Sequence, residues 1–122
     1  MIRQRLGKDL LFFDGGMGTL LQEKGLAPGE LPETWNLTHS EEIYKIHRQY
    51  IEAGSDIILT NTFGANALKF HDDSCSLEEI IKAAVSHVKK AEREALLQTG
   101  DERKIYTALD VGPTGKLLKP MG

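Results

Sequence analysis

The sequence predicts a parallel α/β fold, in which buried strands alternate with amphipathic helices. Three short apolar runs, at residues 10–13, 56–60 and 105–109, have the continuous hydrophobicity of strands that are covered on both faces. Segments with apolar residues at helical spacing separate the runs, and each run ends in a cluster of glycine and polar residues. Strands and helices that alternate in this way are typical of a parallel sheet.

The first apolar run is followed by a glycine-rich turn and then by a short predicted helix that carries Leu20 and Leu21. Gly25 is expected to end this helix, because glycine readily adopts the left-handed conformation that commonly follows a helix. Residues 25–37 contain two prolines and predict a loop, with Trp35 as its hydrophobic anchor.

A longer helix is expected to begin at residues 38–41, which have the form of a capping box. Gly54 is well placed to end it. Its predicted apolar stripe comprises Ile43, Ile46, Tyr50 and Ala53, widened by Tyr44, His47 and Ile51.

Residues 76–79 form a second capping box and predict the longest helix, which Gly100 is expected to end. One predicted face of this helix carries Leu77, Ile81, Ala84, Val88, Ala91 and Ala95. The third apolar run, at residues 105–109, follows directly.

The polar clusters after the three strands occupy residues 14–19, 60–66 and 110–115. In a parallel α/β fold the carboxyl ends of the strands lie at one edge of the sheet, where such folds place their sites. This expected co-location is the main indication of function that comes from the residues themselves.

The first cluster has the chemistry to bind an amino acid. Asp14 could pair with an ammonium group, and the N–H groups of Gly15, Gly16 and Met17 could bind a carboxylate at the start of the following helix. A tight turn whose aspartate caps that helix explains the same residues equally well. Phosphate and dinucleotide loops are less consistent, because their lysine and third glycine are missing.

The second and third clusters leave similar alternatives open. Asn61 and Thr62 could hydrogen-bond a ligand, or they could brace a capped loop whose Phe63 lies in the core. Asp110 could contact a ligand or accept hydrogen bonds within its loop. Gly112 is expected to serve turn geometry.

Composition excludes several classes of protein. The net charge of −3 argues against a nucleic-acid binder, and no apolar run is long enough to span a membrane. Cys75 is the only cysteine, so no internal disulfide can form. A soluble cytoplasmic protein is therefore expected.

Residues 71–75 contain His71, Asp72, Asp73 and Cys75 without any recognised ligand spacing, so we expect a solvated loop and not a metal site.

Taken together, the motifs resemble homocysteine S-methyltransferases. The resemblance rests on residues 13–19, 53–66 and 108–115, with support from residues 32–38 and 46–50, and it covers nearly the whole chain. It is closest to the N-terminal homocysteine-binding module of the cobalamin-dependent methionine synthases.

The resemblance implies that residues 1–122 are the N-terminal part of a zinc-dependent TIM barrel. Such a (β/α)8 barrel needs about 250 residues, so the chain would supply its first three strand–helix units and an incomplete barrel. The implied reaction transfers a methyl group to the homocysteine thiolate, whose pKa zinc lowers, and forms methionine. The substrate-binding residues implied here are Asp14, Gly15, Gly16, Met17, Asn61, Thr62 and Asp110.

The family's zinc cysteines lie in Asn-Cys and Gly-Cys-Cys motifs, and this sequence contains neither. We therefore expect no metal ligand and no catalytic residue in this chain, and no activity from it alone. Methylcobalamin with a folate-derived methyl group is the leading donor, which implies corrinoid-binding and folate-binding modules as partners. S-methylmethionine and betaine are the alternatives.

A second hypothesis is a non-catalytic domain derived from the same family. Three parallel strands with helices on one side leave both sheet edges and one apolar face uncovered. Such a domain could retain an amino-acid-binding half-site, or it could self-associate through its exposed sheet edges.

Overall fold

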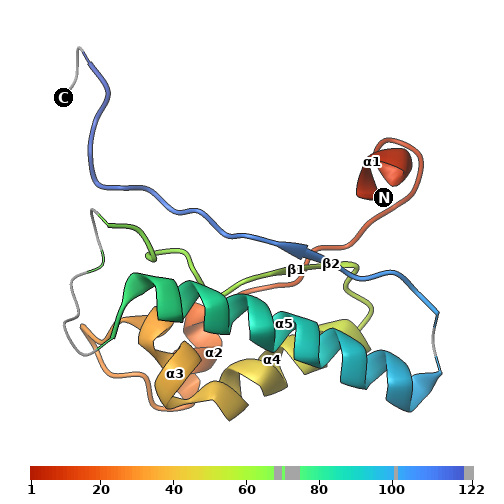
Figure 1. Cartoon of the computed structure of the whole chain (residues 1–122), viewed down its shortest axis with the longest axis horizontal. Helices are drawn as coiled ribbons and strands as arrows, with labels where there is room; N and C mark the ends of the chain where they lie inside the picture. The colour runs from red at the N-terminus through yellow and green to blue at the C-terminus, as the bar shows by residue number, and fades with distance from the viewer. Residues whose placement is uncertain (68–69, 71–74, 101, 120–122) are drawn as a thin grey trace.

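The fold is a mixed α/β arrangement in which a small parallel sheet lies on a layer of helices (Figure 1). The structure is a computed structural model that describes residues 1–67, 70, 75–100 and 102–119. Helices α2, α3, α4 and α5 lie on one side of the sheet, and the short helix α1 lies on the other.

The sheet contains strands β1 (Ile57–Leu59) and β2 (Tyr106–Ala108), which pair in parallel with Ile57 opposite Tyr106. On its other side β1 forms a single parallel bridge between Ile57 and Phe13. The three predicted strand segments are therefore neighbours with β1 in the middle, and the expectation of parallel pairing is confirmed.

The expected first strand at residues 10–13 is wrong in its extent and burial: a strand bridge forms only at Phe13, and the side chains are largely exposed. The N–H of Phe12 is held by the Asp56 side chain at 3.0 Å, in place of a backbone acceptor on β1. Leu10 is 79% exposed, and Phe12 and Phe13 are more than half exposed. The described residues therefore leave these apolar side chains largely uncovered.

The turn after Phe13 leads into α2 (Gly18–Glu23), as the apolar pair at Leu20 and Leu21 predicts. The segment predicted as a loop at residues 25–37 instead contains a 3-10 turn, η1 (Pro32–Thr34), and a one-turn helix, α3 (Trp35–Thr38). Proline at the first position of η1 explains the difference, since its fixed φ is compatible with starting a helical turn as well as with a loop.

Trp35 anchors this segment, as expected. Its side chain is 2% exposed and packs in a core cluster with Leu21 and Ile43. The indole N–H donates to Glu30 Oε1 at 2.8 Å, and the ring stacks on His39 with centroids 3.9 Å apart.

Helix α4 (Ser40–Glu52) forms where its apolar stripe predicts, but its predicted capping box is wrong. Thr38 belongs to the end of α3, and its hydroxyl donates to the Thr34 carbonyl at 3.2 Å. His39 takes the N-cap position without a side-chain cap. The Thr38 hydroxyl therefore serves the preceding helix, which the spacing of residues 38–41 cannot reveal.

Helix α5 (Leu77–Thr99) begins as predicted, with the Ser76 hydroxyl accepting the Glu79 N–H at 3.1 Å. Its buried face contains Ile80 in place of the predicted Leu77 and Ile81. Ala84, Val88, Ala91 and Ala95 are buried as predicted, and Val88, Ala91 and Ala95 pack with Ile51 of α4 and Ile58 of β1.

The glycines predicted to end α2, α4 and α5 all have positive φ, at 112° for Gly25, 111° for Gly54 and 70° for Gly100. An L-residue with a side chain rarely adopts these angles, which is why the helix ends could be predicted.

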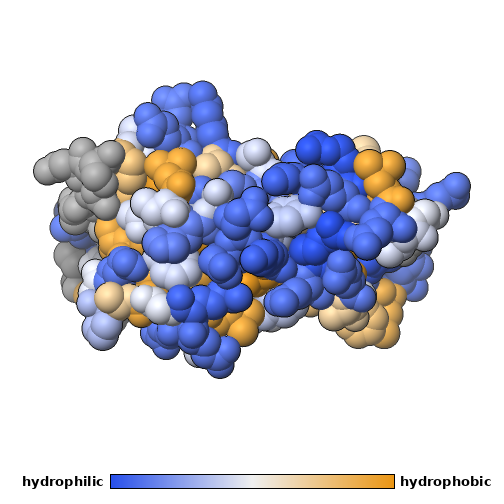
Figure 2. Space-filling view, turned by 90° about the horizontal axis from the view of Figure 1, so that it is seen from below, coloured by the Kyte–Doolittle hydropathy of each residue, from blue (hydrophilic) through white to orange (hydrophobic). Residues whose placement is uncertain are grey.

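The outer face of the helix layer is largely hydrophilic (Figure 2). Large exposed apolar side chains lie in or next to the predicted first and third strands, namely Leu10, Phe12, Phe13, Leu109 and Val111. Helix α1 (Ile2–Arg5), which the sequence did not predict, places Arg5 5.8 Å from the centroid of the Tyr106 ring. No helix within the described residues is long and apolar enough to cross a membrane.

Candidate functional site

A cavity of about 370 Å³ lies where the segments that follow Phe13, β1 and β2 meet. This volume falls within the range of small-molecule sites, which runs from roughly 300 to 1,000 Å³. Six of the seven predicted binding residues line it: Asp14, Gly15, Gly16, Met17, Asn61 and Asp110. The structure thus brings together residues from all three polar clusters, while Thr62 lies outside this cavity.

Asp14 presents one satisfied and one unsatisfied carboxylate oxygen. Its Oδ2 accepts the N–H of Leu59 at 3.2 Å, whereas its Oδ1 is buried without a hydrogen-bond partner. Burial raises the pKa of Asp14 to about 6, although the hydrogen bond from the Leu59 N–H opposes the rise. The nearby Asp110 carboxylate also raises this pKa. A cationic donor that reached Oδ1 would satisfy the oxygen and stabilise its charge.

Beside Asp14, the backbone offers three donors. The N–H groups of Gly15, Gly16 and Met17 donate no hydrogen bond to any described residue. All three residues line the cavity. Successive free N–H groups in a turn favour an anion such as a carboxylate. Asp14 and this turn therefore complement the two opposite charges of an amino acid.

Asn61 lines the cavity, but its amide also braces the surrounding chain. Its Nδ2 donates to the Pro32 carbonyl at 2.9 Å and to Asn36 Oδ1 at 3.0 Å. In return, Asn36 Nδ2 donates to the Asn61 carbonyl at 2.9 Å. This reciprocal pair ties the end of β1 to the segment that contains η1 and α3.

Thr62 braces the end of β2. Its hydroxyl donates to the Asp110 carbonyl at 2.7 Å and lies 2.7 Å from the hydroxyl of Thr60. The Thr60 hydroxyl in turn accepts the N–H of Asp110 at 3.2 Å. The two threonines therefore fix the backbone from which the Asp110 side chain extends.

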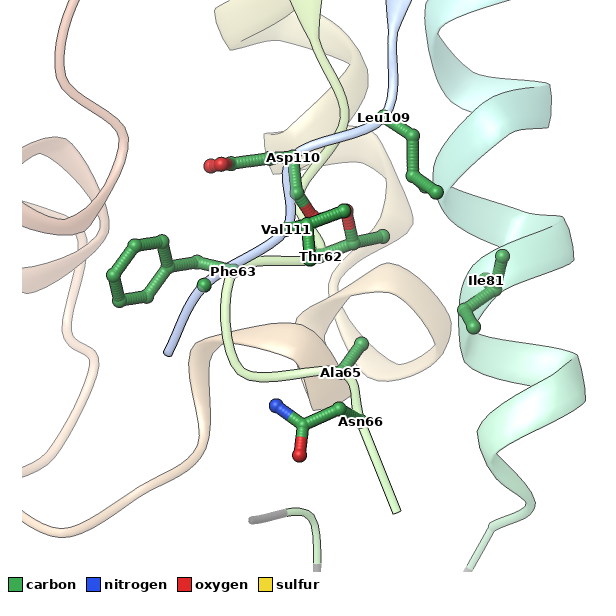
Figure 3. Close-up of a pocket in the computed structure, with 9 residues that line it drawn as sticks. Thr62, Phe63, Ala65, Asn66, Ile81, Leu109, Asp110 and Val111 are labelled. Atoms are coloured by element: carbon green, nitrogen blue, oxygen red, sulfur yellow. The ribbon is translucent and has the colours of Figure 1, made fainter. Parts of the chain in front are cut away.

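The side chains of Asp110 and Phe63 point the same way, away from α5, where Ile81 lies (Figure 3). Phe63 is 54% exposed and lines the large cavity, so the alternative that placed it in the core is wrong. Its carbonyl accepts the N–H of Gly112 at 3.0 Å, and this pairing of the two loops holds its side chain on the cavity side.

A second, smaller pocket of about 50 Å³ lies between Thr62, Asn66 and Ile81 (Figure 3). A volume of this size is enough for water but not for an amino acid with a four-carbon chain. The larger cavity is therefore the candidate substrate site.

Two further residues near the cavity were not identified from the sequence as site residues. Glu33 lines it while only 4% exposed, and its Oε1 accepts the N–H of Gly64 at 2.5 Å. Tyr50 of α4 covers Gly15 from the helix side, where a β-carbon on Gly15 would lie 2.8 Å from the Tyr50 hydroxyl. Glu33 lies in a segment that predicts a loop, and Tyr50 fits an apolar stripe. Both lie in segments that support the family resemblance, but that resemblance assigned neither residue to the site.

The described residues do not fit a zinc site. Among residues 1–67, 70, 75–100 and 102–119, no group of three or more His, Cys, Asp or Glu side chains could hold a metal ion. Cys75 is partly exposed and forms no disulfide. His71, Asp72 and Asp73 lie outside the described residues.

Comparison with known proteins identifies the family. The family model described as Homocysteine S-methyltransferase matches residues 11–122. The homocysteine methyltransferase MmuM from Escherichia coli has a similar structure in three forms. Its metallated form matches with a TM-score of 0.78 and 24% identity, over 93% of this chain and 42% of that chain.

The oxidised form of the same Escherichia coli protein matches with a TM-score of 0.75 and 24% identity, over 89% of this chain and 39% of that one. The apo form matches with a TM-score of 0.71 and 24% identity, over 92% of this chain and 40% of that one. This likeness shows a shared fold, and this chain spans less than half of the length of that protein. Because the family match covers all but the first ten residues, the chain belongs to the homocysteine S-methyltransferase family.

Proposed function

We propose that this chain supplies the amino-acid-binding part of a homocysteine S-methyltransferase that forms methionine. The observation that carries the proposal is the unpartnered Oδ1 of Asp14 beside the free N–H groups of Gly15, Gly16 and Met17. Homocysteine carries an ammonium and a carboxylate on one carbon. Asp14 would bind the ammonium, and the turn would bind the carboxylate.

The remaining predicted residues have distinct roles in this proposal. Asp110 adds a second carboxylate to the cavity and favours a cationic group there. Asn61 and Thr62 would act mainly on the walls of the cavity, since their side chains hydrogen-bond to Pro32 and Asp110. With its amino-acid end held, homocysteine would direct its thiol away from the turn toward the methyl donor.

The described residues contain no cluster that could hold a metal ion to activate the thiol. Zinc, which lowers thiol pKa values by binding the thiolate, would have to be held by residues outside them. That the similar Escherichia coli protein has a metallated form supports a metal in the complete domain.

The complete domain is proposed to be a (β/α)8 barrel of which this chain forms the first three strand–helix units. The parallel order of Phe13, β1 and β2 supports this architecture, as does the helix layer on one side of the sheet. The uncovered apolar side chains on the opposite side would then face the barrel interior.

The proposed enzyme is of the methionine synthase type and cytoplasmic. Methylcobalamin is its proposed methyl donor, with corrinoid-binding and folate-binding modules as partners; S-methylmethionine and betaine remain the alternatives. Assay of the complete protein with each donor in turn decides among them, and turnover with betaine alone would contradict the proposal.

The exposed apolar side chains also favour a second candidate, a non-catalytic domain that assembles with copies of itself. The coding sequence beyond residue 122 separates the two candidates. Downstream Asn-Cys and Gly-Cys-Cys motifs would support the enzyme. A stop codon directly after residue 122, with a stable oligomer in solution, would support the assembly domain.

Asp14→Asn tests the substrate-binding role of Asp14. In the protein that carries the complete domain, this change should raise the homocysteine KM about tenfold or more, because a hydrogen bond to a charged group contributes about 1.5–3 kcal/mol. Folding and zinc content should be nearly unchanged, since asparagine keeps the shape. The measurement is steady-state kinetics on the zinc-loaded enzyme.

Asp9→Asn is the matched control, because Asp9 pairs with Arg5 on the exposed N-terminal segment, at 2.9 Å. It should leave the homocysteine KM unchanged. If Asp14 only caps the turn, asparagine would serve as well, and an unchanged KM for Asp14→Asn would defeat the proposed role.

A chain of residues 1–122 should not retain zinc through treatment with a chelator, because it offers one cysteine and no thiolate cluster. Elemental analysis of the purified and chelated chain measures this directly. One zinc ion per chain after chelation would show that the expectation is wrong.

A further inference from the structure

The turn that holds the free N–H groups is fixed from the helix layer by one side chain, that of Tyr50. The Tyr50 hydroxyl, on α4, donates to the Gly16 carbonyl at 2.6 Å. The ring also lies against Gly15, where a β-carbon would come within 2.8 Å of the hydroxyl and 3.0 Å of the ring carbon Cε1. Glycine at position 15 therefore lets Tyr50 approach the backbone of the turn closely.

The hydrogen bond to Gly16 determines where the next N–H points. In a trans peptide the carbonyl and the following N–H are coplanar and point in opposite directions. A Gly16 carbonyl directed at Tyr50 therefore turns the Met17 N–H away from Tyr50. Gly16 and Met17 line the large cavity and Tyr50 does not, so the side away from Tyr50 is the cavity side.

We propose that Tyr50 is a positioning residue that holds the Gly16–Met17 peptide with its N–H toward the cavity, where it binds the carboxylate of the substrate. This inference rests on the proposed function and adds a residue to it. Tyr50 does not line the cavity, so it acts through the peptide and not by contact with the substrate.

The surroundings of Tyr50 keep its hydroxyl a donor. Burial raises the pKa of the Tyr50 hydroxyl, and the nearby Asp14 carboxylate raises it further. The hydroxyl therefore stays protonated at neutral pH and donates its proton to the Gly16 carbonyl. Its ring packs against both core clusters, so the ring and the hydroxyl have separable roles in stability and positioning.

Tyr50→Phe separates those roles, because it keeps the ring and removes only the hydroxyl. In the complete protein we expect the homocysteine KM to rise about three- to tenfold, which is the loss of one hydrogen bond, with kcat nearly unchanged. The inhibition constant of an aminopropanethiol, which is homocysteine without its carboxylate, should not change. A purely structural effect of the missing hydroxyl would weaken both ligands.

Tyr44→Phe is the matched control. Tyr44 lies on the same helix, and its hydroxyl donates to Glu94 and accepts from Arg48 Nη1, away from the cavity residues. This variant should leave the homocysteine KM and the aminopropanethiol inhibition constant as they are in the wild type.

The outcomes separate this inference from the proposed function. A raised KM for Asp14→Asn with an unchanged KM for Tyr50→Phe would overturn the positioning role alone. Equal weakening of homocysteine and the aminopropanethiol by Tyr50→Phe would overturn it as well. Unchanged KM values in both variants would defeat the homocysteine site itself, and the inference with it.

Discussion

Replacing Gly112 with alanine is expected to lower the free energy of unfolding by about 1–3 kcal/mol or more, the usual range for overpacking a well-packed region. A β-carbon at this position would lie 2.2 Å from the Phe63 carbonyl oxygen and 3.0 Å from both its carbonyl carbon and Cδ2. Two of these atoms are backbone, so no side-chain rotation can relieve the overlap. The hydrogen bond from the Gly112 N–H to Phe63 would be lost as the loops separate.

Urea unfolding followed by circular dichroism measures the effect of Gly112→Ala. Gly18→Ala is the control, since nothing lies within 4 Å of a β-carbon there and its φ is not in the positive range. Gly18 begins α2, where alanine is favoured over glycine by about 0.5–1 kcal/mol. Equal unfolding midpoints for wild type and Gly112→Ala would contradict the expected overlap. Gly112 therefore serves close approach of two loops, and not the turn conformation that the sequence suggested.

His47 is expected to give the second large effect, a loss of stability in mild acid. Its side chain is 0% exposed, and neither ring nitrogen has a hydrogen-bond partner. Burial, together with a smaller effect of the neighbouring His87, lowers the pKa of His47 from 6.5 to about 4. Between pH 4 and pH 6.5, His47 therefore binds a proton in the unfolded chain that it does not bind in the folded chain.

The stability contribution of His47 is therefore full above pH 6.5 and is lost as the pH falls toward about 4. A shift of this size corresponds to about 3 kcal/mol, at 1.36 kcal/mol for each pKa unit.

Asp14 acts in the opposite direction. Its folded pKa is raised from 3.8 to about 6, so the folded chain binds the extra proton and acid relieves the cost of burying its charge.

The two groups titrate over overlapping pH ranges with opposite signs, so wild type should show a shallow dependence of stability on pH. His47→Leu, which removes the buried imidazole, should become more stable relative to wild type as the pH falls from 6.5 to 4. Asp14→Asn should lose stability more steeply than wild type over the same range. Urea unfolding at several pH values measures the free energy of unfolding. If this free energy changed with pH in the same way in wild type and His47→Leu, the expectation would be contradicted.

Elements with a dense local pattern could be predicted from the sequence. Strand β1 has a continuous apolar run, and helices α4 and α5 combine apolar periodicity with an ending glycine at Gly54 or Gly100. These signals depend only on neighbouring residues. The Ser76 cap could be predicted for the same reason. Thr38 shows the limit of such patterns, because its hydroxyl can bond the helix before it or the helix after it.

The errors arise where a side chain's environment depends on distant segments. Phe12 and Phe13 have the composition of a buried strand, yet no described element covers them. Phe63 is turned toward the cavity by the contact between its backbone and Gly112, 49 residues later. The cavity residues after the three strands could be anticipated, because the carboxyl ends of parallel strands share one edge. Glu33 lines the cavity from η1, and Tyr50 contacts the neighbouring turn from α4. No local pattern indicates either arrangement.

The environment of Trp35 makes it an intrinsic optical probe of this protein. It is the only tryptophan in the sequence, and its indole is buried, hydrogen-bonded to Glu30 and stacked on His39. Unfolding would release the indole to water and shift its fluorescence emission to longer wavelength. Because Trp35 packs with Leu21 and Ile43 and not with the α5 cluster, its emission reports on the region beside the cavity. Comparing emission with far-ultraviolet circular dichroism would therefore show whether that region opens before the long helix melts.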